Sequence, residues 1–187
     1  MQPVTEAMQL FRHQRAVRDF AGRPVDDATL RQVLEAAIHA PSGSNTQPWK
    51  FIVVRDRAVR EALDAEYAEV QRARGNAPSG PGVMAKAPVL IVPCVRVPDR
   101  TGQAGFQTGA SIYPACQNLM LAARALGLGT VLTTSHRARR EQVHALLGIP
   151  EGWESAAIIP LGWPDRAYGP NHRAPVDQAI CFDHWAE

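Results

Sequence analysis

Apolar positions along this 187-residue chain recur with a helical period in some segments and run continuously in others. Behind two candidate N-caps, Asp26 and Asp27, apolar side chains recur three and four residues apart, which predicts a helix over 28–40. Residues 49–54 (WKFIVV) and 88–95 are short, mostly apolar runs, which are typical of buried strands. The same criteria predict helices over 57–74 and 136–147 and strands over 129–134 and 155–161.

Another helix is predicted around apolar side chains at near-heptad spacing: Ile112, Cys116, Leu119, Ala123 and Leu126. Its other faces are also mostly apolar, so we expect it to be buried on several sides, in the core or at a subunit interface. Pro114 either opens this helix in its first turn or kinks it, and Gly127 is expected to end it.

Two segments and the C-terminal end are predicted to be irregular. Residues 74–81 (RGNAPSGP) are predicted to form a mobile surface loop, and 98–105 separate a strand from a helix. Residues 168–187 are polar but carry Phe182 and Trp185, so we expect this tail to dock on its own domain or on a partner subunit. The interleaved helices and strands, without internal repeats, predict one domain over 1–187 of the α+β or α/β class.

Composition narrows the class of protein. Hydrophobic residues are 45% and charged residues 20%, which excludes a fully disordered chain, and a net charge of +2 does not favour nucleic acid as partner. The three cysteines are scattered, which argues against a disulfide framework and fits a reducing cytoplasm. No signal-peptide pattern is visible, and the apolar runs are too short to span a bilayer, so neither secretion nor a membrane is expected.

The segment 40–51 (APSGSNTQPWKF) joins a predicted helix to a predicted strand. Its small hydroxyl and amide side chains, together with Gly43, would let the backbone approach a flat ligand and offer it hydrogen-bond donors. An ordinary helix-to-strand turn has the same composition, so both interpretations stay open here.

The segment 12–20 (RHQRAVRDF) carries three arginines within seven residues. Guanidinium groups at this density can bind a phosphate or another anion, although a solvated basic helix end is the plainer interpretation. Arg18 follows Arg15 by three residues, so a helical turn would project both side chains to one side.

Other catalytic patterns are incomplete. Gly127 and Gly129 do not form a dinucleotide-binding fingerprint, because Leu132 stands where the third glycine is needed and the pair opens a strand. The six histidines include no pair at metal-ligand spacing, and G-x-S-x-G does not occur. Cys94 and Cys116 lie in apolar runs, which is typical of unreactive core thiols.

Taken in order, several segments together resemble the FMN-dependent nitroreductase family. The most specific is A-P-S-x-x-N-x-Q-P-W at 40–49; the others are 15–20 (RAVRDF), 122–130 (AARALGLGT), 159–164 (IPLGWP) and 171–173 (NHR). Their order and spacing cover nearly the whole chain. The resemblance implies an α+β nitroreductase-like fold, with a central, mainly antiparallel sheet flanked by helices, in an intertwined homodimer with FMN at its interface.

The resemblance also implies a set of cofactor-binding residues. The FMN phosphate would lie beside Gln14, Arg15, Ala16 and Arg173, and the N1–C2 edge of the flavin beside Arg18. The segment with Pro41, Ser42, Gly43, Asn45 and Gln47 would line the ring from the other subunit, and Leu132, Thr133 and Thr134 would face it near N5. Three positions depart from the family pattern, since Gln14 replaces an arginine, Ala16 a serine and Asn171 a lysine, so part of the usual phosphate-binding set is missing.

The implied function is ping-pong hydride transfer. NAD(P)H would reduce FMN and leave, and a nitroaromatic, quinone or similar electron-poor acceptor would enter the same site, with no protein acid or base required. A cation at Arg18 would stabilise the negative charge near N1 of reduced flavin. Two alternatives are a flavin-binding carrier or sensor without turnover, and a small α/β hydrolase or transferase that uses Cys116 or His136.

Overall fold

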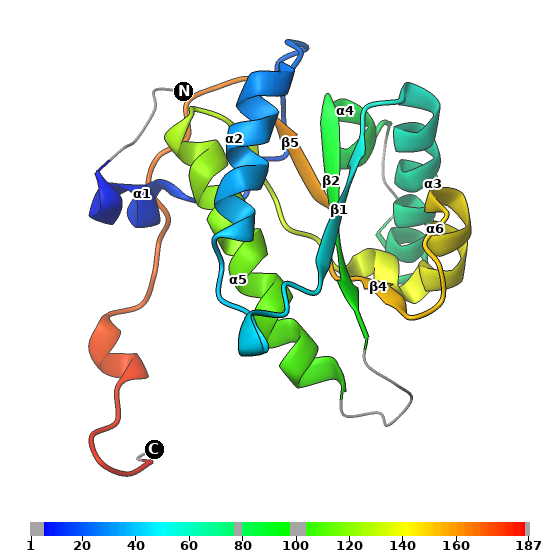
Figure 1. Ribbon diagram of the computed structural model, residues 1–187. Coiled ribbons are helices and arrows are strands. Elements are labelled where there is room, and N and C mark those ends of the chain that lie inside the picture. The colour runs from blue at the N-terminus through cyan, green and yellow to red at the C-terminus, as the bar shows by residue number, and fades with distance from the viewer. Residues whose placement is uncertain (1–5, 77–79, 98–103, 186–187) are drawn as a thin grey trace.

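The structure, a computed structural model, describes residues 6–76, 80–97 and 104–185 and has one antiparallel sheet with helices on both faces (Figure 1). The strands are β1 (Trp49–Val54), β2 (Val89–Arg96), β3 (Gly129–Thr130), β4 (Trp153–Ser155) and β5 (Ile159–Gly162). Their order is β1-β2-β5-β3, and β4 pairs with β2. The predicted α+β class with a mainly antiparallel sheet is confirmed.

Helices form the two outer layers. The α-helices are α1 (Ala7–His13), α2 (Asp27–Ile38), α3 (Arg57–Ala73), α4 (Val83–Lys86), α5 (Ala104–Ala125) and α6 (Arg140–Leu147). Short 3-10 helices are η1 (Gly43–Asn45), η2 (Ser135–Arg139) and η3 (Val176–Ala179). In Figure 1, α2 and α5 cover one face of the sheet, while α3, α4 and α6 cover the other. None of the helices in the described ranges is long and apolar enough to cross a membrane.

The continuous apolar run of β2 reflects burial on both faces. Val89, Ile91 and Val95 pack into the core beneath α2 and α5, whereas Leu90 and Val92 pack into the core beneath α3, α4 and α6. Successive strand residues point to opposite faces, so a strand between two helical layers needs apolar residues at both sets of positions. The expected strands at 49–54 and 88–95 are therefore present, the second shifted by one residue.

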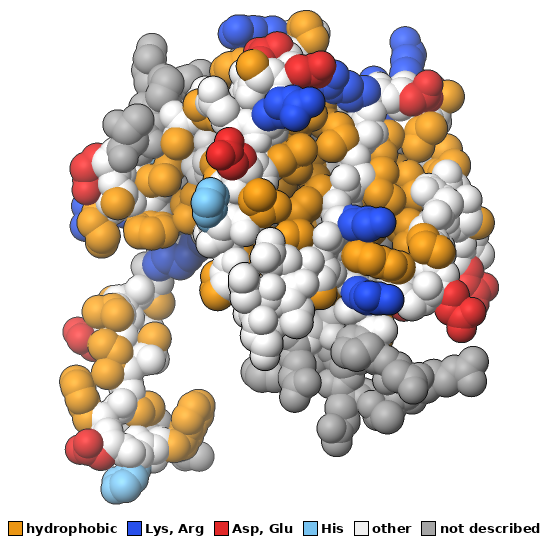
Figure 2. All heavy atoms as spheres, viewed as in Figure 1, with side chains coloured by type: hydrophobic (Ala, Val, Ile, Leu, Met, Phe, Trp, Pro, Cys, Tyr) orange, Lys and Arg blue, Asp and Glu red, His pale blue; other side chains and the backbone are white. Residues whose placement is uncertain are grey.

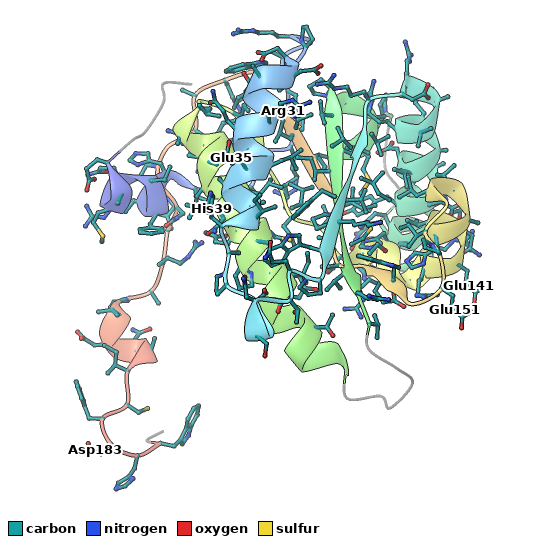
Figure 3. All side chains as sticks on the ribbon, viewed as in Figure 1. Arg31, Glu35, His39, Glu141, Glu151 and Asp183 are labelled. Atoms are coloured by element: carbon teal, nitrogen blue, oxygen red, sulfur yellow. The ribbon has the colours of Figure 1, made fainter. Side chains whose placement is uncertain are left out.

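Helix α2 begins after the predicted N-cap, and its apolar side faces the core as the pattern predicts. Asp26 is the N-cap, and its Oδ1 accepts a hydrogen bond from the backbone N–H of Thr29 at 2.7 Å. Leu30, Val33 and Ala37 are buried. Arg31, Glu35 and His39, four residues apart, lie along the outward side in Figure 3.

Helix α5 is longer than predicted and lies against α2 and the sheet. Ile112, Cys116, Leu119 and Ala123 of the predicted stripe are buried, whereas Leu126, its last member, follows the end of the helix and is half-buried. Pro114 lies well inside the helix, so the option that it opens the first turn is wrong. Gly127 ends the helix with a φ of +86°, and the next amide, Leu128 N–H, donates to the carbonyl of Ala123 at 2.8 Å.

Two predicted strands are shorter than expected. The segment 155–161 is divided between β4 and β5, because Pro93 of β2 has no N–H to donate on the side that faces them. Pro93 only accepts there, from Ala156 N–H at 2.9 Å. The strand expected over 129–134 ends at Thr130, after which Thr133 forms one isolated bridge with Ile158.

The remaining differences concern turns and ends. The helix expected over 136–147 is a 3-10 turn followed by α6. The loop predicted at 74–81 includes residues 77–79, and the irregular stretch at 98–105 includes 98–103; these lie outside the described residues, and α5 begins at Ala104.

The C-terminal tail leaves the body beside α1 and extends away from it (Figure 1). Phe182 and Trp185 are 84% and 89% exposed, so these rings do not dock on their own domain. Docking on a partner subunit, the other option for the tail, stays a prediction. Figure 2 shows the apolar side chains spread along it, and Asp183 marks its far end in Figure 3.

Candidate functional site

A basic pocket of about 590 Å³ lies between α1, α5 and the start of the tail. Among the described residues, its lining contains four arginines and no aspartate or glutamate: Met8, Phe11, Arg12, Gln14, Arg15, Ala16, Arg18, Gln117, Met120, Thr130, Val131, Leu132, Asn171 and Arg173. Figure 2 shows basic side chains where the tail leaves the body. Several guanidinium groups without a neighbouring carboxylate create a positive potential, so the pocket favours an anionic ligand.

The segment after α1 holds its arginines on extended backbone. Helix α1 ends at His13, so the expectation that a helical turn carries Arg15 and Arg18 is wrong. Ala16 instead forms a parallel bridge with Thr130, and Val17 N–H donates to the Thr130 carbonyl at 2.9 Å. Val17 is buried and fixes this segment against β3, from which both arginines still reach the pocket.

Gly129 of β3 makes this close approach possible. A Cβ on Gly129 would lie 2.6 Å from Cγ1 of Val17, far inside van der Waals contact. Only a residue without a side chain therefore allows the arginine-bearing segment to lie this close to the sheet.

Neighbouring groups orient two of the arginines. The guanidinium carbon of Arg15 lies 5.7 Å from the centre of the Tyr168 ring, a cation–π distance. Arg173 Nη1 donates to the carbonyl of His172 at 2.7 Å. Both side chains are exposed, so their remaining donors are accessible to a ligand.

One buried hydroxyl lies behind the pocket wall. Thr130 is 1% exposed, and its Oγ1 has no hydrogen-bond partner among the described residues. The oxygen is closed to solvent, so a ligand in the pocket would reach it only after a shift of the wall.

The predicted segment 41–47 forms a separate part of the surface. Pro41, Ser42 and Gly43 line a pocket of about 340 Å³ with Ala110 and Ser111 of α5. The basic pocket meets α5 at Gln117, six positions further along, or about 9 Å of helix rise. Within one chain the two groups of predicted residues are therefore not brought together.

The backbone of this segment is strained. Ser44, Asn45 and Gln47 have φ values of +51°, +53° and +47°, a region that residues with a Cβ rarely adopt. Ser42 supports the turn, because its Oγ accepts from Gln47 N–H at 3.0 Å. Asn45 is exposed, and Gln47 lines another pocket beside Arg96. Strain of this kind clusters at ligand sites, which favours the ligand-binding interpretation over an ordinary turn.

The predicted Leu132–Thr134 segment is divided. Leu132 lines the basic pocket, whereas Thr133 and Thr134 lie outside its lining. Thr133 pairs through its backbone with Ile158, and its buried Oγ1 lacks a partner among the described residues. Thr134 is exposed and is the N-cap of η2.

The alternative catalytic residues lie in the core. Burial raises the pKa of the Cys116 thiol to about 12 and that of Cys94 to about 11, so neither is a thiolate nucleophile near neutral pH. His136 and His144 each place Nε2 3.1 Å from Ser155 Oγ, and burial lowers the pKa of both imidazoles. This arrangement is a buried hydrogen-bond network, which does not support the hydrolase alternative.

The prediction missed several residues of the basic pocket. Arg12 lies in the basic segment but is not among the predicted cofactor-binding residues. Gln117 and Met120 of α5 each lie one position after a residue of the apolar stripe, and no local pattern marks them as ligand-facing. Thr130 was assigned only to a strand. The signal for these residues is their proximity to the Arg15–Arg18 segment, which depends on the fold.

Known proteins resemble this chain in sequence and in fold. The sequence model of the Nitroreductase family matches residues 11–163. The chain is 31% identical to an NADH dehydrogenase of Thermus thermophilus, over 96% of this chain and 97% of that protein. It is 32% identical to a 5,6-dimethylbenzimidazole synthase of Rhodospirillum rubrum, over 83% and 80% of the two chains. A solved structure, the NADPH:FMN oxidoreductase of Vibrio harveyi complexed with NAD⁺, shares the fold with a TM-score of 0.83 at 24% identity, covering 98% of this chain and 79% of that one.

Proposed function

Because the chain belongs to the nitroreductase family, we propose that it is an FMN-dependent oxidoreductase that uses NAD(P)H to reduce nitroaromatic, quinone or similar electron-poor organic acceptors. The names of the Thermus and Vibrio relatives support a nicotinamide donor, and that of the Vibrio protein supports FMN. The observation that carries the proposal is the basic pocket, whose described lining gathers four arginines beside an apolar wall.

The residues of this pocket fit FMN. A phosphate monoester carries up to two negative charges near neutral pH, and Arg12, Arg15 and Arg173 offer guanidinium donors for it. Met120, Val131 and Leu132 supply apolar surface for a flat ring. Bound FMN would supply the hydride chemistry that connects NAD(P)H to the acceptor.

The roles of the chain's own residues follow from their charge. We assign Arg15 and Arg173 to the phosphate, with Gln14 and Ala16 beside it, and Arg18 to the N1–C2 edge of the flavin. Arg12 adds a cation that the family pattern does not require and offsets the missing arginine at Gln14. Arg18 would stabilise charge that the ring gains on reduction and needs no proton transfer to do so.

A second subunit would complete the site. The 41–47 segment is separated from the basic pocket along α5 within one chain, so it would reach a flavin only from the partner. We therefore propose a homodimer in which Pro41, Ser42, Gly43, Asn45 and Gln47 of one chain meet the basic pocket of the other. We also propose a cytoplasmic location, because NAD(P)H is regenerated there.

Anaerobic reconstitution tests the function. Apoprotein mixed with FMN should retain the flavin after gel filtration, and NADPH or NADH should bleach its absorption near 450 nm. A nitroaromatic or quinone should restore the colour, and initial rates against both substrates should give parallel double-reciprocal lines. Failure to retain FMN would overturn the proposal. Reduction without acceptor turnover would favour the carrier or sensor alternative.

A further inference from the structure

Asn171 joins the tail to the C-terminal end of α1 by three hydrogen bonds. Its backbone N–H donates to the carbonyl of Arg12 at 2.7 Å. Its side-chain Nδ2 donates to the carbonyls of Phe11 and Gln14, each at 2.9 Å. Asn171 is half-buried and lies in the wall of the basic pocket. We infer that Asn171 is a positioning residue, which orients the arginines of this pocket toward an anionic group of the ligand.

The physical reason lies in the end of the helix. The last carbonyls of an α-helix have no partner within the helix, and they carry the negative end of its dipole. Those of α1 border a pocket that would hold an anion, where uncovered carbonyl oxygens are unfavourable neighbours. Asn171 donates hydrogen bonds to the carbonyls of Phe11 and Arg12 in the last turn and to that of Gln14 just beyond it. A helix of seven residues is not stable by itself, so external contacts of this kind determine where it lies.

The same residue links the two sources of positive charge. Arg12 and Arg15 adjoin the carbonyls that Asn171 binds, and Arg173 follows Asn171 by two residues in the tail. These arginines come from segments about 160 positions apart in the sequence, and their separation in space depends on this junction. Asn171 contributes no charge itself, so its effect on an anion would be exerted through the arginines.

This inference rests on the proposed function, because FMN is the ligand used to test it. Apoprotein is titrated with FMN and with riboflavin, which lacks the phosphate. In Asn171→Ala the Kd for FMN should rise about tenfold, and the Kd for riboflavin should stay within about twofold. Asn171→Leu, which keeps the approximate size and removes the side-chain donors, should change the two Kd values to the same extent as Asn171→Ala. Asn76→Ala, the same change at an exposed position far along the chain, is the matched control.

A double-mutant cycle separates positioning from direct contact. In a protein that already carries Arg12→Ala, Arg15→Ala and Arg173→Ala, adding Asn171→Ala should change the FMN Kd by less than about twofold, because the arginines it positions are gone. An undiminished loss in that background, or an equal loss for riboflavin in the single variant, would overturn the inference. If wild-type apoprotein binds neither flavin, the proposed function fails. If FMN binds and Asn171→Ala leaves the FMN-to-riboflavin ratio unchanged, only the role of Asn171 fails.

Discussion

Arg15 and Arg18 lie on one extended segment, but their proposed roles differ in how they depend on the redox state. Arg15 is assigned to the phosphate, whose charge does not change on reduction, and Arg18 to the ring edge, which gains charge only in the reduced flavin. The geometry permits this division, since Arg15 lies near Tyr168 and both arginines line the pocket.

Substitution of these two arginines should therefore separate affinity from redox potential. Arg15→Ala should weaken oxidised and reduced FMN alike and leave the midpoint potential unchanged. Arg18→Ala should weaken the reduced form more, and a differential loss of about 1.5 kcal/mol would lower the midpoint by roughly 30 mV for a two-electron couple. Potentiometric titration of both variants measures this. An unchanged midpoint in Arg18→Ala would contradict the ring-edge assignment.

The buried pair His136 and His144 makes stability depend on pH. Burial lowers both imidazole pKa values in the folded protein; Arg137 and Arg140 add to this, while Glu154 opposes it. The unfolded chain then binds protons that the folded state excludes. The contribution of the two neutral imidazoles to the free energy of unfolding is fully present above the ordinary histidine pKa of about 6.5. It is lost as pH drops below that value, by up to about 1.4 kcal/mol per pH unit for each imidazole.

Urea unfolding at pH 5.0, 6.0 and 7.5 tests this dependence. His136→Gln should make the decline in free energy of unfolding between pH 6.5 and 5 shallower, whatever its effect at pH 7.5. His39→Gln, on the exposed side of α2, should retain the steep decline because both buried imidazoles remain. Identical slopes for wild type and His136→Gln would contradict the account.

The contact between β3 and the segment after α1 couples the sheet to the basic pocket. Gly129→Ala would force its Cβ against Val17, the buried anchor of that segment. We expect a loss of about 1–3 kcal/mol in free energy of unfolding and weaker FMN binding, because Val17 must move and take Ala16 and Arg18 with it.

Denaturant unfolding and FMN titration of Gly129→Ala check this coupling. Gly22→Ala is the control, since a Cβ there meets no atom within 4 Å, and its stability should stay within about 0.5 kcal/mol of wild type. Wild-type affinity for FMN in Gly129→Ala would show that the segment does not depend on this close approach.

The exposed apolar side chains of the tail support the proposed homodimer. Val176, Phe182 and Trp185 are 67%, 84% and 89% exposed, an unusual amount of apolar surface for residues near a chain end. In the proposed homodimer a second copy of this chain would cover these side chains and would also bring the separated halves of the site together.

Sedimentation equilibrium tests this arrangement. The full chain should sediment at twice its 20.4 kDa mass at micromolar concentration. Deletion of 174–187, which leaves Asn171 and Arg173 in place, should weaken the dimer and release FMN, and Phe182→Ala with Trp185→Ala should do so more mildly. A 20.4 kDa species of the full chain that retains FMN would contradict the dimer.

The sequence by itself determined the parts of this protein whose signals are local. The N-cap Asp26, the apolar runs of β1 and β2 and the αL-favouring Gly127 placed those elements within a residue or two, because caps, strands and helix stops depend on neighbouring residues. The segments that resemble the family identified six residues of the basic pocket: Gln14, Arg15, Ala16, Arg18, Leu132 and Arg173.

The tertiary structure alone decided features that depend on partners distant in the chain. The extended course of the segment after α1 requires pairing of Val17 with Thr130, and the division of β4 from β5 requires Pro93 opposite Ala156. Likewise, the sequence shows only that Asn171 replaces a lysine of the family pattern. Its three hydrogen bonds exist because the fold brings the tail to the end of α1. The periodicity of a segment does not predict such contacts, because each one depends on two segments that are distant in the sequence and have no unusual local pattern.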